Sequence, residues 1–92
     1  MHGVVVAVDI HGNREEAEKL LREFTVPRAK SLDGFVRGVW LRSEDGSQGR
    51  GVILLDTEEN ARAAAGQIRQ GPPPGAPVTL RGVDLFEVMA EA

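Results

Sequence analysis

The sequence lacks cysteine and tyrosine, and its aromatic residues are few: Phe24, Phe35, Trp40 and Phe86. Without cysteine it can form no disulfide, thiolate nucleophile or Cys-ligated zinc site, which fits the reducing cytoplasm, where we expect the protein to reside. Long apolar runs are also missing, because Asp9 interrupts the N-terminal stretch GVVVAVDI, which has no basic region or cleavage site. We therefore expect neither a signal peptide nor a membrane span.

An excess of basic residues is absent too. The chain has 11 Lys and Arg against 14 Asp and Glu, a net charge of −3, with the two signs interspersed. Nucleic-acid binding depends on basic groups that neutralise phosphates, so nucleic acid is not an expected partner. The segment GSQGRG precedes a strand rather than a helix, so it cannot present helix amide groups to a phosphate.

What remains is a pattern of strands and helices for one domain, residues 1–92. Asn13 is a good helix cap, and Pro27 is expected to end or kink the first helix near Thr25 or Val26. Asp56 or Thr57 is expected to start the second helix, and Gly82 to mark a bulge or a bend. The predicted strands are 3–10, 35–42, 51–55 and 78–89, and the predicted helical stripes are Ala17, Leu20, Leu21 and Phe24, then Ala61, Ala64, Ala65 and Ile68.

The resulting order, βαββαβ, predicts an α+β fold of the ferredoxin-like type: an antiparallel four-stranded sheet with two helices on one face. The first and third strands are the most uniformly apolar, as expected for central strands. The face without helices would then carry Val5, Ala7 and either Val52 or Ile53. Such a patch indicates an interface, so we expect a homodimer through this sheet face. The alternative is that these apolar residues serve folding alone.

Most of the chain, about residues 3–90, resembles the antibiotic-biosynthesis-monooxygenase-like group of the dimeric α/β-barrel superfamily. The resemblance is carried by a helix ending in VPRAKSL, then DGFVRGVWLR, a DG loop, VILLDTEENARAAA and a last strand like VDLFEVMAEA. Relatives often have Pro-Gly-Phe where this chain has Asp33-Gly34-Phe35. The resemblance implies a ferredoxin-like protomer whose sheet packs against a second copy. It also implies possible cofactor-independent oxygenation of a small aromatic or lipophilic molecule.

The segment DGFVRGVW holds two of the aromatic residues, and strand alternation predicts Phe35 and Trp40 on opposite faces. Gly38, on the face of Trp40, would leave space for a bulky group. We expect a mostly apolar cleft between sheet and helices, lined or filled by Phe24, Trp40 and Phe86. The alternative for Trp40 is ordinary core or interface packing.

Few residues are suited to chemistry in such a cleft. His11 is a candidate base near neutral pH, and Arg37 or Arg42 a candidate for holding an oxyanion. Each also fits a structural role, His11 as a turn residue and the arginines as solvated strand residues. Asp9 and His11 alone are too few for a metal site, and we expect no cofactor. The Asn, Trp and His of haem-degrading relatives have no match here, so haem degradation is not expected.

Two functions are compatible with this pattern: a cofactor-independent monooxygenase and a non-catalytic barrel that binds a small ligand or is associated with stress. RNA-recognition domains share the same element order. Their stacking aromatics would fall on Val52 and Leu54 here, and the first strand has no aromatic residue. RNA binding through the sheet is therefore not expected.

Overall fold

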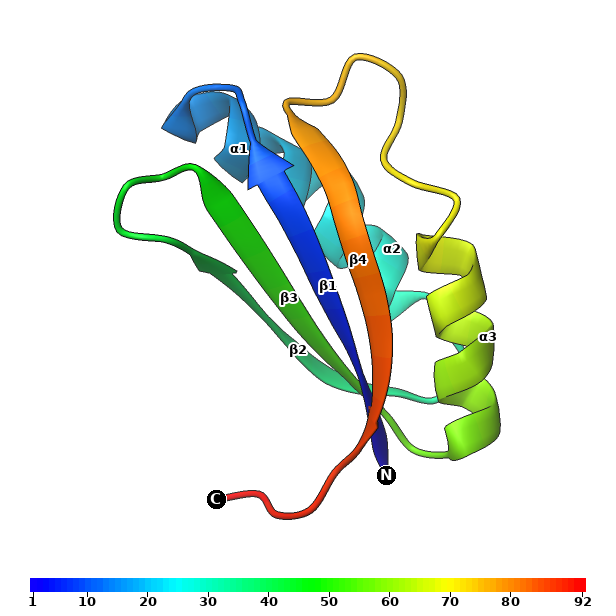
Figure 1. The fold of residues 1–92 in the computed structure, drawn as a ribbon. Helices are drawn as coiled ribbons and strands as arrows, with labels where there is room; N and C mark the ends of the chain where they lie inside the picture. The colour runs from blue at the N-terminus through cyan, green and yellow to red at the C-terminus, as the bar shows by residue number, and fades with distance from the viewer.

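The segments rich in β-branched residues form one antiparallel sheet in this computed structural model, which describes residues 1–92 (Figure 1). The strand order is β2-β3-β1-β4, so the first and third strands are central, as predicted. The predicted ferredoxin-like order is confirmed. The elements are β1 (His2–Ile10), α1 (Arg14–Leu20), η1 (Leu21–Thr25), α2 (Val26–Lys30), β2 (Phe35–Arg42), β3 (Gln48–Leu55), α3 (Glu58–Ile68) and β4 (Val78–Glu87).

The first predicted helix corresponds to α1, η1 and α2, which follow one another without a break and are together called the first helix. It starts at a capping box. The Asn13 side chain accepts a hydrogen bond from the Glu16 backbone N–H at 2.8 Å, and the Glu16 carboxylate accepts one from the Asn13 N–H. Pro27 does not end this helix, which continues to Lys30, but the regular α-helical bonding is interrupted just before it, where η1 ends at Thr25 and α2 begins at Val26. A π-helical turn, η1, shifts the bonding so that the Val26 N–H donates to the Leu21 carbonyl. Pro27 then lies in the first turn of α2, where a missing N–H is tolerated.

The second predicted helix corresponds to α3, and its small side chains let it pack close to the sheet. Its cap is Thr57, whose hydroxyl accepts from the Asn60 N–H at 3.1 Å, while Asp56 accepts from the Asn60 side-chain amide. The predicted alanine stripe faces the core, where Ala61, Ala64 and Ala65 are buried. None of the helices is long and apolar enough to cross a membrane.

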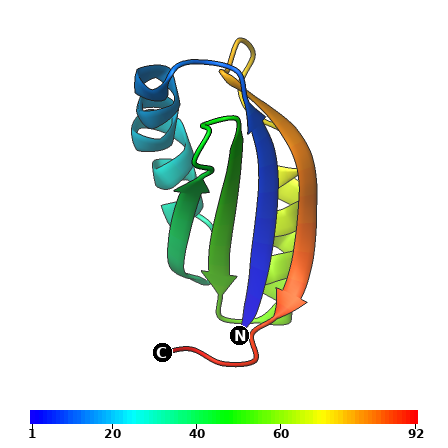
Figure 2. The same cartoon turned by 60° about the vertical axis from the view of Figure 1, so that its left-hand side comes forward.

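The helices divide the covered face of the sheet between them. In Figure 2, α1 and α2 lie beside the β2 edge and α3 lies behind β1 and β4. The close backbone approaches to the sheet come from α2, at β2, and from α3, at β1, β3 and β4. The buried core lies there and includes Val4, Ile53 and Leu55. Because α1 does not approach the strands as closely, space remains between it and the sheet.

A bulge at the start of β2 changes which face its residues occupy. Phe35 pairs with Leu55 and Arg37 with the adjacent Leu54, so Val36 has no partner. The prediction that Phe35 and Trp40 lie on opposite faces is therefore wrong. Both lie on the helix-covered face and pack against the core. The predicted bulge in β4 is confirmed, since Ala7 pairs with Gly82 and Val8 with Leu80.

The turn into β2 depends on Gly34, which has φ of 75° and whose carbonyl accepts from the Asp56 N–H. A Cβ at this position would overlap the Asp56 carboxylate. Gly34→Ala is expected to lower the free energy of unfolding by at least about 2 kcal/mol, through backbone strain plus this overlap. Gly75→Ala is the matched control, because Gly75 has φ of 79° but open space around it. Urea unfolding that gives equal losses for both variants would contradict the role of the overlap.

The β2–β3 hairpin is stabilised by one carboxylate. Asp45 accepts hydrogen bonds from the Ser47 hydroxyl, the Ser47 N–H and the Ser43 hydroxyl at 2.7, 2.9 and 2.8 Å. These bonds, those from Ser47 first, lower the pKa of Asp45 from 3.8 to about 2.

Because the folded pKa of Asp45 is depressed, its stabilising contribution is present above about pH 4 and is lost as the pH falls toward 2. We expect a carboxyl NMR titration midpoint near pH 2 for this residue, and Ser47→Ala is expected to move it upward. A midpoint near 3.8 in the unmodified protein would contradict the hydrogen-bonded hairpin.

Candidate ligand cavity

A cavity of about 290 Å³ lies between the first helix and the sheet. Its walls are mainly apolar, with Val6, Val8 and Ile53 on the sheet side and Leu21 and Phe24 on the helix side. The wider π-helical turn belongs to this wall, since Leu21 and Phe24 are both in η1. A concave apolar space with a few polar groups is the usual form of a small-molecule site.

Trp40 lines the cavity and is seated on two glycines. A Cβ at Gly38 would be 2.7 Å from Trp40 Cη2, and a Cβ at Gly51 would be 3.0 Å from its Cδ1 and Nε1. Larger residues at either position would push the indole away from the strands. The space predicted at Gly38 therefore exists, but the indole of Trp40 itself occupies it. The glycines let a large ring lie against the sheet, so that the volume beside it stays open.

Arg28 forms part of the cavity wall and is held in place by three contacts. Its Nη2 donates to the Gln67 carbonyl at 2.8 Å, its Nη1 to the Gly71 carbonyl at 3.4 Å, and its guanidinium lies 5.5 Å from the centroid of the Phe24 ring. These bonds tie the first helix to the end of α3. None of the ion pairs of the protein includes Arg28, so its charge has no carboxylate partner.

The other arginines along the cavity are exposed. Arg14 is paired with Glu18 at 3.0 Å, and Arg42 lies over Gly46 in the hairpin. Only the backbone side of Arg50 belongs to the cavity, because Arg50 pairs with Ala7 and Leu41 and its side chain lies on the uncovered face of the sheet. An exposed ion pair such as Arg14–Glu18 contributes little to the free energy of folding. The rim of the cavity thus carries two arginines, Arg14 and Arg42, and Glu18 is its one carboxylate.

The structure brings together two of the five residues predicted for the pocket. Phe24 and Trp40 line the cavity, whereas His11, Arg37 and Phe86 lie outside it. His11 is an exposed turn residue whose Nε2 lies 3.0 Å from Thr79 Oγ1. Arg37 lies on the face away from the helices because of the β2 bulge, and Phe86 lies there because it alternates with core-facing Leu85.

Arg28 was missed by the sequence analysis, although the sequence holds a signal for it. It follows Phe24 by four residues, and residues at this spacing share a helix face. Arg42, a predicted oxyanion-binding residue, does line the cavity.

The residues of the cavity can bind an aromatic ligand and stabilise charge on it, but they include no evident general base. No histidine lines the cavity, and the carboxylate of Glu18 is occupied by Arg14. No three His, Asp or Glu side chains gather closely enough to hold a metal ion. The cavity can therefore enclose an apolar ring and stabilise negative charge on it through arginine.

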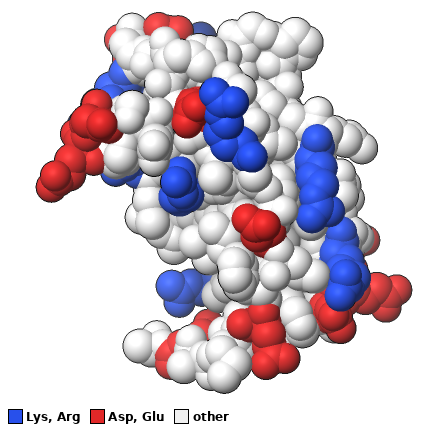
Figure 3. Space-filling model, in the orientation of Figure 1, with Lys and Arg blue, Asp and Glu red and all other residues white.

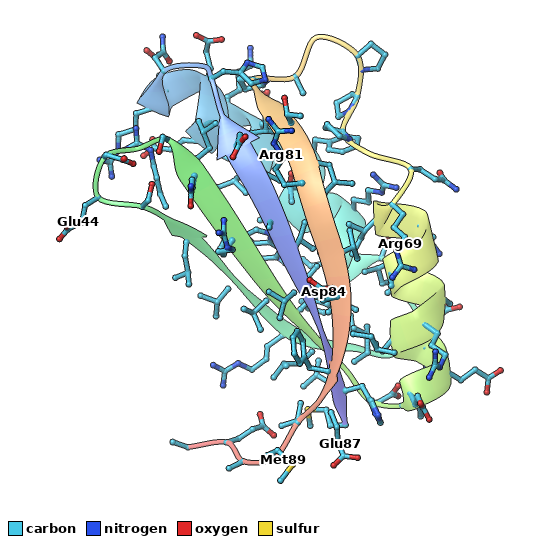
Figure 4. All side chains as sticks on the ribbon, in the orientation of Figure 1. Glu44, Arg69, Arg81, Asp84, Glu87 and Met89 are labelled. Carbon is cyan, nitrogen blue, oxygen red and sulfur yellow. The ribbon has the colours of Figure 1, made fainter.

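The uncovered face of the sheet forms a second feature. Val39, Leu41 and Phe86 are 42%, 55% and 55% exposed, and strand pairing places Val5 and Val52 on the same face. Figure 3 shows this side as a largely uncharged field with isolated charges. Asp84 and Arg81 on β4 are among these charges (Figure 4), and Arg81 is paired with Asp9. The choice left open between Val52 and Ile53 falls on Val52, because Ile53 is buried under the helices.

Comparisons with known proteins find solved structures with a similar fold. No family model matches the sequence, and no curated protein does. Among solved structures, SnoaB, a cofactor-independent oxygenase from Streptomyces nogalater, has a TM-score of 0.71 at 21% identity, covering 98% of this chain and 94% of that chain. A dimeric ferredoxin-like protein from an uncultured marine organism has a TM-score of 0.63 at 13% identity, covering 100% and 98%.

The haem-degrading protein MhuD from Mycobacterium tuberculosis, with two haems bound, has a TM-score of 0.59 at 20% identity, covering 97% of this chain and 98% of that chain. All three identities are low, so these likenesses concern the fold. They confirm the structural resemblance to the monooxygenase-like proteins and the ferredoxin-like architecture. The activity and the site residues are not determined by them.

Proposed function

We propose that the protein is a cofactor-independent oxygenase that binds a small electron-rich aromatic or lipophilic molecule in the cavity beside Trp40. The observation that carries the proposal is the apolar cavity that Trp40 and Phe24 both line, with arginines along its wall and rim. The structural similarity to SnoaB, described as a cofactor-independent oxygenase, supports it at the level of fold.

The chemistry available to these residues is charge stabilisation. A phenolic substrate would stack against Trp40, and arginine would stabilise its phenolate, which is the electron-rich form that can react with O₂. For a substrate with a methylene carbon activated by the phenolate, one oxygen atom forms the new C=O group. The other leaves as water, with the two hydrogens and the electrons of the broken C–H bonds. The substrate supplies all the electrons, so no external reductant is needed.

This chemistry gives a pH dependence. Since no histidine lines the cavity, the phenol must lose its proton to solvent, and the rate is expected to rise with pH around the pKa of the substrate bound beside arginine. Two phenols of different acidity, tested by oxygen uptake, should give profiles that are displaced accordingly. A single profile common to both phenols would indicate a protein base and contradict this prediction.

Oxygen uptake with a panel of electron-rich phenols that carry an activated methylene carbon tests the activity itself. Incorporation of one ¹⁸O atom from ¹⁸O₂ into the product is the expected result. His11→Ala is the control variant, because His11 is outside the cavity, and it is expected to retain full activity. Loss of turnover in this variant, with ligand binding intact, would return His11 to the role of base and overturn the proposed site.

The second candidate function is non-catalytic binding of a small ligand. The observation that favours it is that few polar side chains line the cavity, and its only carboxylate, that of Glu18, is already paired with Arg14. Retained ligand binding with no oxygen uptake on any phenol of the panel would decide for this function.

The uncovered sheet face supports a homodimer. It is apolar at its centre, where Val5, Val39 and Val52 form one row across three strands. Exposed apolar patches of this kind mark interfaces, and a two-fold axis lets the same patch cover itself. The marine protein of the same fold is described as dimeric. We infer that two sheets face each other in the active protein.

A further inference from the structure

Arg28 differs from every other arginine of the chain, because it is half-buried and the others are exposed. A charge removed from water is costly unless it is paired. The partners of Arg28 within the protein are two backbone carbonyls and an aromatic ring, which satisfy hydrogen bonds without neutralising the charge. An uncompensated cation is therefore held at the wall of an apolar cavity.

The guanidinium also has donors to spare. It carries five N–H groups in a planar fork that matches an oxyanion, and the two recorded hydrogen bonds use one on each Nη. Its position is fixed by Gln67, Gly71 and the Phe24 ring, so little side-chain entropy would be lost when a ligand binds.

We propose that the cavity selects an amphipathic monoanion: an aromatic or lipophilic body beside Trp40, with one carboxylate, sulfonate or phenolate group bound to Arg28. This deepens the proposed function, on whose cavity it rests. The exposed arginines of the rim are weaker candidates for the anion, because water screens their charges and Arg14 already has a carboxylate partner.

The proposal can be tested with a pair of probes that differ only in the anion. 1-Anilinonaphthalene-8-sulfonate carries a sulfonate, and N-phenyl-1-naphthylamine is the same aromatic body without it. Binding is followed by probe fluorescence and by quenching of Trp40, the only tryptophan. The wild-type protein is expected to bind the sulfonate at least about 10-fold more tightly than the neutral probe, as a charge-assisted hydrogen bond provides. Equal affinities, or a preference for the neutral probe, would overturn the proposal.

Arg28→Gln is expected to weaken sulfonate binding about 10-fold or more while leaving the neutral probe within about 2-fold. Arg69→Gln is the matched control, since Arg69 is exposed on the end of α3 (Figure 4) and is not part of the cavity wall. Its affinities are expected to equal those of the wild type. Retention of the sulfonate preference in Arg28→Gln, or its loss in Arg42→Gln instead, would assign the anion elsewhere and overturn the role of Arg28.

Arg28 also ties the first helix to Gln67, so its replacement by glutamine can weaken the fold. Arg28→Lys keeps the charge and removes the planar fork, and an intermediate sulfonate affinity is expected. Wild-type affinity in Arg28→Lys would contradict recognition by the fork. No oxygen is consumed in these titrations, so they can fail while the oxygenase activity is found, or succeed while it is not.

Discussion

Val39→Asp is expected to convert the proposed dimer to a monomer that keeps its fold. Val39 pairs with Val52 in the centre of the uncovered sheet face and is already 42% exposed in the protomer, so a carboxylate there remains solvated in the monomer. In the dimer the same carboxylate would be buried against apolar residues of the second copy, at a cost of several kcal/mol. A cost of about 3 kcal/mol corresponds to a dissociation constant raised about 100-fold.

Ala63→Asp provides the matched control, because it adds the same charge at an exposed position of α3, away from the uncovered face. Sedimentation over a range of concentrations should show a dimer for the wild type and this control, and a monomer for Val39→Asp. Circular dichroism should show the same fold in all three. A wild-type monomer, or a Val39→Asp dimer of unchanged affinity, would refute the sheet-face interface.

Trp40→Ala is expected to produce the largest loss of ligand affinity, about 30-fold or more. The indole is the largest ring on the cavity wall, and stacking with an aromatic ligand would be lost together with the buried area. We expect the free energy of unfolding to fall by about 2 kcal/mol, less than the roughly 3–5 kcal/mol of a fully buried aromatic, because Trp40 is only half-buried.

Trp40→Phe is the companion variant, since it retains an aromatic face above Gly38 and Gly51. Its affinity for N-phenyl-1-naphthylamine, measured by fluorescence, should lie between those of the wild type and Trp40→Ala. Wild-type affinity in Trp40→Ala, with the fold intact by circular dichroism, would show that the ligand binds away from this ring.

The element order could be read from the sequence because each element carries a local signal. The span of β2 was predicted at both ends, and the alanine stripe of α3 identified its buried face. The predicted start of β3, residue 51, lies three residues after the observed start at Gln48, because Gln48, Gly49 and Arg50 are not typical strand residues. They pair with β1 and β2 all the same, since hairpin geometry continues the ladder beyond the apolar run.

The positions of the candidate site residues were harder to predict. A single unpaired residue, Val36, reverses the alternation of β2, and nothing in DGFVRGVW marks it as a bulge. The π-helical turn Leu21–Thr25, which ends two residues before Pro27, likewise has no marker in the local sequence. Alternation from Leu85 assigns Phe86 to the uncovered face, whereas the prediction that Phe86 lines the pocket rests on its aromatic side chain alone.

The Trp40 indole N–H gives the most direct test of the cavity as the ligand site. The chain has one tryptophan, so a ¹⁵N-correlated NMR spectrum contains a single indole signal. On titration with N-phenyl-1-naphthylamine we expect large shifts of this signal and of the backbone amides of Phe24 and Arg28. The amides of Val39 and Val52 on the uncovered face should hardly change. An unmoved indole signal with shifts confined to Val39, Val52 and their neighbours would place the ligand on the sheet face and contradict the cavity.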